Sequence, residues 1–164
     1  MKDLMHPDDA KVLKALDRAK EKGDVTWIRP LVEAFAARPD DPLREAMGEL
    51  LGSLKLSAAE GMFLEMLEDP QWAGIKADLL GFLWSCGFTC PGHLALVARV
   101  ACEGDFRQAM EGCTLVEQVE TVDDERDLLE AITVVSQALQ EGSPVSDWLE
   151  PMHAHLSMLN HHMD

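Results

Sequence analysis

A weak self-similarity with a period close to 32 residues constrains the fold of this chain more than any other feature. The apolar pattern of residues 31–35 (Leu-Val-Glu-Ala-Phe) returns at residues 63–67 (Phe-Leu-Glu-Met-Leu). The pair Leu43-Arg44 matches Ile75-Lys76, 32 positions later, and Ile75-Lys76 matches Phe106-Arg107, 31 positions further on. A period of 20–50 residues is typical of repeated units that stack on one another and bury a shared core.

The Pro, Gly, Asp and Ser residues between apolar segments mark helix ends and predict that each repeated unit is a pair of helices. Pro7 with two aspartates opens a helix that ends before Gly23, and Pro42 and Ser57 stand where further helices are expected to begin. A later helix is expected to begin at Pro91, capped by Thr89 or Cys90. No segment shows the alternation of a strand. The expectation is an all-α protein of about nine helices joined by short turns, in which Phe106, Met110 and Cys113 form one of the apolar stripes.

The unit of apolar helix, Asp- and Pro-rich turn, and second helix with an early basic residue resembles the HEAT-repeat (armadillo-like) family. The matching stretches are residues 28–44 and 63–76, with a weaker copy over 94–107. This resemblance implies a short right-handed α-α superhelix over one α-solenoid domain, 1–164. Residues 1–22 would be a flanking helix, residues 24–119 the repeats, and residues 123–162 the flanking C-terminal helices. Tetratricopeptide repeats are the nearest rival, with a period of 34 and a preferred Tyr that this chain lacks.

Charge limits the kinds of partner. The chain has 164 residues and a formal net charge of −16; residues 61–164 hold 18 Asp and Glu against four Lys and Arg. Such a surface repels phosphate backbones and anionic membranes, which disfavours nucleic-acid and membrane binding. No apolar run approaches the roughly 20 residues of a membrane span, and the N-terminus lacks a signal-peptide pattern. We expect a cytoplasmic protein whose partner, if charge selects it, is basic.

The resemblance also suggests which residues face a partner. HEAT-like stacks present the second helix of each unit as a broad surface for other proteins, which here means residues 42–54, 71–86 and 105–119. Trp72, in a turn after Pro70, is the best single candidate for an exposed aromatic residue at a contact surface, although packing under the neighbouring turn is favoured over exposure. Trp27 and Trp148 fall in apolar stripes and are expected in the core. The candidate partner surface consists of Glu45, Glu49, Trp72, Asp78, Glu111 and Glu117.

The sequence offers no motif for catalysis, cofactor binding or metal binding. No phosphate-binding glycine loop, calcium loop or nucleophile elbow occurs, so no catalytic, cofactor or metal residue is predicted. The histidines of the last helix, His153, His155, His161 and His162, do not converge on one face and are expected in solvent. Cys90 is expected at a helix start, where the dipole would favour a thiolate. The expected function is a non-catalytic protein-interaction module. Self-association is the alternative, and a HEAT-like lyase or glycosylase a remote one.

Overall fold

The computed structural model describes residues 2–163, and all of its regular secondary structure is helical. Nine α-helices and three short 3-10 helices account for it, and no strand occurs among these residues, so the all-α prediction is confirmed. The contacts within the chain define two compact units, Met1–Ile75 and Lys76–Asp164, which we call the first and second units. Their boundary falls inside the predicted repeats, 24–119. One continuous solenoid domain over 1–164 stays a prediction.

The first unit follows the predicted helix starts closely. Asp8 caps its first α-helix by accepting a hydrogen bond from the backbone N–H of Ala10, and Asp41 caps a later one with Pro42 in the first turn. The core lies where α1, α2 and α3 meet, and it is filled by Leu, Val, Met and Phe side chains. The elements are η1 (Lys2–Met5), α1 (Asp9–Lys22), η2 (Val25–Trp27), α2 (Ile28–Ala36), α3 (Pro42–Leu51), α4 (Ala58–Glu68) and η3 (Pro70–Ile75).

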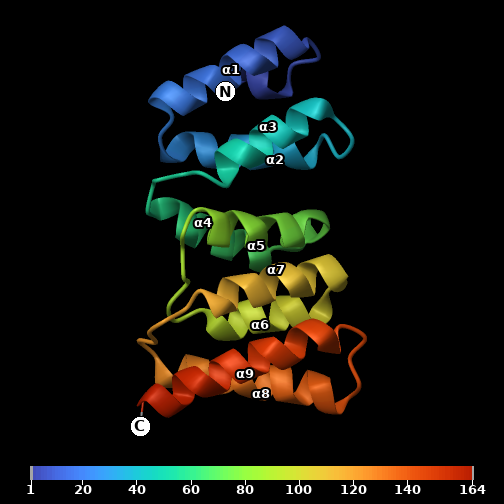
Figure 1. Ribbon diagram of the computed structural model, residues 1–164. Coiled ribbons are helices and arrows are strands. Elements are labelled where there is room, and N and C mark those ends of the chain that lie inside the picture. The colour runs from blue at the N-terminus through green and yellow to red at the C-terminus, as the bar shows by residue number, and fades with distance from the viewer. Residues whose placement is uncertain (1, 164) are drawn as a thin grey trace. The chain divides into compact units, whose positions relative to one another are not determined.

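The second unit consists of five helices in two rows (Figure 1). One row is formed by α5, α7 and α9 and the other by α6 and α8, while α6–α7 and α8–α9 are hairpins. The α6–α7 and α8–α9 turns lie at one end of the unit, which we call the hairpin end, and the α7–α8 connection lies at the opposite end. The elements are α5 (Lys76–Ser85), α6 (Leu94–Glu103), α7 (Phe106–Glu117), α8 (Glu125–Gln140) and α9 (Ser146–Met163).

Close packing fixes the α6–α7 hairpin. A Cβ atom on Gly112 of α7 would lie only 2.7 Å from the Cβ of Ala101 on α6 and 3.6 Å from the Cε of Met152 on α9. The missing side chain therefore lets two helix backbones approach each other at a buried position. This glycine, which breaks the rule that helices avoid glycine, has a packing reason.

The start of α6 differs from the prediction. The helix begins at Leu94 rather than Pro91, and neither Thr89 nor Cys90 caps it. Cys90 has a φ of 51° and Gly92 a φ of 80°, so the chain turns twice through the left-handed region before the helix begins. The carboxylate of Asp127, on α8, accepts hydrogen bonds from the backbone N–H groups of Leu94 (2.7 Å) and Ala95 (3.1 Å) instead. The cap comes from a distant helix, and a local sequence pattern could not reveal it.

Candidate functional site

Three of the six residues predicted to face a partner are exposed. Glu45 and Glu49 lie on the solvent side of α3 in the first unit, and Glu117 lies at the end of α7 in the second unit. These carboxylates are positioned to meet a cation from outside the chain. Whether a partner does meet them stays a prediction.

Two other predicted residues, Asp78 and Glu111, are turned toward a neighbouring helix. Asp78 on α5 accepts a 2.6 Å hydrogen bond from Arg107 of α7 and keeps only 11% of its side chain exposed. Glu111 on α7 accepts a 2.5 Å hydrogen bond from the indole N–H of Trp84 on α5. Gly81 leaves room for it, since a Cβ there would lie 3.3 Å from Oε2 of Glu111. The prediction that both are exposed is wrong, because adjacent helices of one row supply donors for them.

The contact between α5 and α7, which we call the α5–α7 seam, also stabilises the charged form of Arg107. The hydrogen bond to Asp78 raises the pKa of Arg107 above its ordinary value, and the negative charges of Asp78, Glu111 and Asp105 act in the same direction. The guanidinium thus stays charged and oriented. The seam joins two helices and leaves half of Arg107 in solvent.

Trp72, the candidate for an exposed contact residue, is buried, which agrees with the favoured alternative that it packs against neighbouring elements. Only 3% of it is exposed, because η3 packs against α2 and α4 and lays the indole ring on them. The guanidinium of Arg29 lies over the ring, 5.8 Å from its centroid. Trp72 borders a cavity of about 310 Å³ whose other lining residues are Ala36, Pro39, Arg44, Gln71, Gly74 and Ile75. Trp27 and Trp148, which were predicted to be core residues, are only partly buried. The most buried of the four tryptophans is therefore the one in the turn.

The prediction for Cys90 is corrected, and the prediction that the last-helix histidines lie in solvent is confirmed for His161 and His162 and corrected for His153 and His155. Cys90 is fully buried in the loop before α6, so it does not lie at a helix start. His153 is 2.9 Å from the hydroxyl of Ser136, and Nε2 of His155 is 2.8 Å from the carbonyl oxygen of Val119. Because a carbonyl only accepts, Nε2 of His155 carries the hydrogen. These two histidines tie α9 to its neighbours. No group of His, Cys, Asp and Glu able to hold a metal occurs within residues 2–163.

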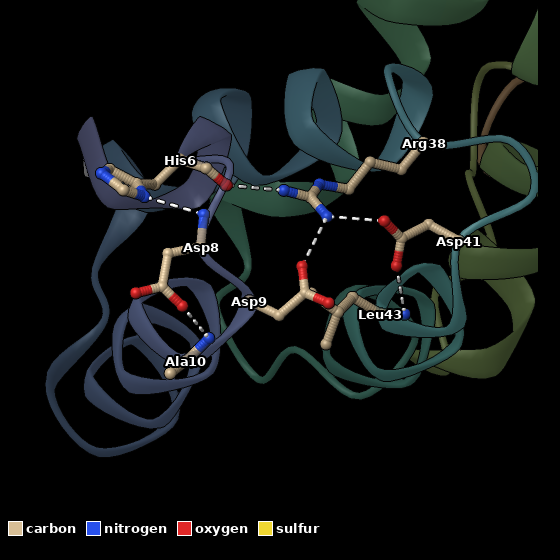
Figure 2. Close-up of polar contacts among 7 residues, drawn as sticks. All are labelled: His6, Asp8, Asp9, Ala10, Arg38, Asp41 and Leu43. Atoms are coloured by element: carbon tan, nitrogen blue, oxygen red, sulfur yellow. Dashed lines mark hydrogen bonds and ion pairs between the residues drawn. The ribbon is translucent and has the colours of Figure 1, made fainter.

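The densest polar cluster of the first unit centres on Arg38 (Figure 2). Its guanidinium donates to a carboxylate oxygen of Asp41 (2.6 Å) and to the carbonyl of His6 (2.9 Å), and lies 3.7 Å from the carboxylate of Asp9. The other oxygen of Asp41 caps α3 through the N–H of Leu43. Arg38 is only 14% exposed. The cluster fastens the N-terminal segment to the α2–α3 turn, and its geometry is that of a structural clamp.

The second unit carries a large surplus of carboxylates. It holds 15 Asp and Glu against four Lys and Arg, a net charge of −11. Arg107 is paired with Asp78, and Arg99 with Glu130 at 3.1 Å. Exposed carboxylates cluster around the α7–α8 connection, namely Glu117, Glu120, Asp123, Asp124 and Glu125.

Sequence reasoning missed an exposed aromatic pair at the hairpin end. Phe106, which was placed in the apolar stripe of α7, is 61% exposed. Its ring meets that of Trp148 on α9 edge-on, with centroids 5.4 Å apart and an interplanar angle of 73°. The available signal was its position directly after the cap residue Asp105, because the first helical residue projects from the helix end before the stripe begins.

No family model matches the chain, and neither the curated proteins nor the solved structures supply a match. Within residues 2–163, none of the helices combines the length and the apolar character that crossing a bilayer requires.

Proposed function

We propose that this protein is a non-catalytic interaction module that binds a basic protein or peptide, and that its helices belong to a HEAT-like α-solenoid. The observation that carries the proposal is the unbalanced charge of the second unit, −11, with two of its four cations held in ion pairs. The exposed carboxylates of the second unit outnumber its cations, of which Arg126 lies beside the α7–α8 connection, and this surplus of negative charge attracts a cationic partner and speeds its association.

The helix arrangement of the second unit supports the fold part of the proposal. Each helix contacts the next helix but one in the chain: α5 contacts α7, α7 contacts α9, and α6 contacts α8. This is the adjacency that a stack of helical hairpins would have. Asp78, Glu111 and Asp127 form hydrogen bonds between these helices. The binding surface is therefore proposed to lie on the remaining exposed carboxylates.

Fluorescence anisotropy with a short labelled peptide rich in Lys and Arg tests this function. We expect binding that weakens as salt is raised from about 50 to about 300 mM, because exposed charges are screened over that range. Reversing Glu117 and Glu120 to Lys should weaken binding about tenfold. The matched control reverses Glu45 and Glu49 to Lys in the first unit, where cations are more numerous, and should have a smaller effect.

Two results would count against the proposal. One is the absence of binding even at low salt. The other is binding that responds neither to salt nor to either reversal, because the carboxylates would then have no part in recognition.

Self-association is the second candidate function, and exposed apolar side chains favour it. Leu129 on α8 and Met158 on α9 are 45% and 43% exposed. Light scattering distinguishes the two, because a monomer has a mass of 18.2 kDa and a dimer twice that.

A further inference from the structure

The aromatic pair at the hairpin end of the second unit is an apolar surface that the fold does not cover. Phe106 is the most exposed large apolar residue among residues 2–163. Trp148 holds it edge-on, and the indole N–H of Trp148 is buried without a hydrogen-bond partner in the described structure. A ring fixed in this way offers contact area at little cost in conformational entropy, as aromatic residues at binding hot spots do.

Carboxylates surround the pair. Asp105 and Asp147 directly precede the two aromatic residues, at the starts of α7 and α9, and both are exposed. Glu103 and Glu141 are exposed at the ends of α6 and α8, which the two hairpin turns bring to the same end of the unit (Figure 1). The cation beside the pair is Arg107, and Asp78 already binds it. The patch is thus apolar at its centre and acidic at its rim.

We propose that Phe106 and Trp148 anchor a peptide segment in which an apolar side chain is flanked by Lys or Arg. The apolar side chain rests on the Phe106 ring, while the flanking cations face Asp105 and Asp147. This proposal rests on the proposed function and gives it a location. Charge disfavours a second copy of this chain as the occupant, because it would bring another acidic rim to the same place.

Two labelled peptides test the anchor, both rich in Lys and Arg, one with a central Leu and one with Gly in its place. We expect the Leu peptide to bind about tenfold more tightly to the unaltered protein. Phe106→Ala should remove that preference while leaving the affinity for the Gly peptide nearly unchanged. Leu129→Ala, at a similarly exposed apolar residue on α8, is the matched control and should keep the preference. Asp147→Lys should weaken both peptides.

The outcomes separate this surface from the general function. Binding of both peptides with a preference that survives Phe106→Ala overturns the anchor and leaves the basic-partner function standing. Failure of both peptides to bind at low salt overturns both. A dimer in light scattering that Phe106→Ala converts to monomer assigns the patch to a second copy and overturns the peptide proposal.

Discussion

Both units satisfy polar groups at helix ends with charged side chains, but the central side chain of the polar contacts has opposite charge in the two units. In the first unit the centre is a cation, Arg38, which gathers a carbonyl and two carboxylates from neighbouring segments. In the second unit the central groups are carboxylates, and each reaches a different helix from its own. Asp127 caps α6 from α8, and Glu111 receives the indole N–H of Trp84.

The difference explains part of the charge asymmetry. Ten of the 14 Lys and Arg residues lie in the first unit, where aspartates such as Asp8, Asp24 and Asp41 cap elements only two residues away. The second unit has local caps of this kind in Asp105 and Asp124, but its acidic residues also make hydrogen bonds between helices, with partners 27 to 33 positions away in sequence. Acidic character in that unit is therefore partly structural, and only the remaining exposed carboxylates are available to a partner.

The largest expected effect comes from glycine packing, which should have opposite signs in the two units. Gly112→Ala in the second unit forces a Cβ against Ala101, and we expect it to lower the free energy of unfolding by about 2 kcal/mol. Gly61→Ala in α4 of the first unit meets nothing within 4 Å and should raise it by about 0.5–1 kcal/mol. Urea unfolding of both variants provides the measurement. Equal effects of the same sign would show that the hairpin of α6 and α7 is not closely packed.

The next largest effect compares the capping of α6 by Asp127 of another helix with the local capping of α1 by Asp8. Asp127→Ala removes both carboxylate hydrogen bonds at the start of α6 and should cost about 1–2 kcal/mol. Hydrogen exchange should speed up at Leu94 and Ala95, 32 to 33 residues away in sequence. Asp8→Ala, the local control in the first unit, should speed exchange only near the start of α1. If amide hydrogen exchange at Leu94 were unchanged in Asp127→Ala, Asp127 would not stabilise the start of α6.

The smallest effect concerns thiol reactivity, a property of the second unit because all four cysteines lie there. Burial, with the nearby Glu117 carboxylate, raises the pKa of Cys113 to about 12. The thiolate fraction at pH 9 should then be about a thousandth, and alkylation followed by mass spectrometry should be slow. Glu117→Gln should lower that pKa and speed the reaction several-fold. The matched change, Glu103→Gln, acts on Cys102, whose pKa burial and Glu103 raise to about 11.

These raised thiol pKa values also determine how the free energy of unfolding changes with pH. The unfolded thiols release their protons near pH 9, whereas the folded thiols keep them up to about pH 11 and 12. The free energy of unfolding should therefore fall as pH rises above 9. If Cys113 is alkylated as fast in the folded protein as in urea, the burial argument is wrong.

Local patterns in the sequence predicted what local physics decides. The predicted helix starts after Pro7 and at Pro42 follow from Asp8 and Asp41, whose side chains accept hydrogen bonds from N–H groups two residues on, and both are confirmed. The start of α6 could not be found in this way, because its cap, Asp127, comes from another helix. Asp78 and Glu111 were predicted to be exposed for the same reason, since their partners lie on a neighbouring helix. For Trp72 the sequence allowed both exposure and packing and favoured packing, but its place in a turn did not reveal which elements the side chain packs on.

The four tryptophans divide evenly between the units, with Trp27 and Trp72 in the first and Trp84 and Trp148 in the second. The Trp84 indole hydrogen is held by a carboxylate across the α5–α7 seam, which shifts its proton resonance and slows its exchange with solvent. Because α5 is the first helix after the boundary between the units, this single resonance reports whether that helix stays seated on α7. The protein thus carries its own spectroscopic reporter for the contact between α5 and α7 of the second unit.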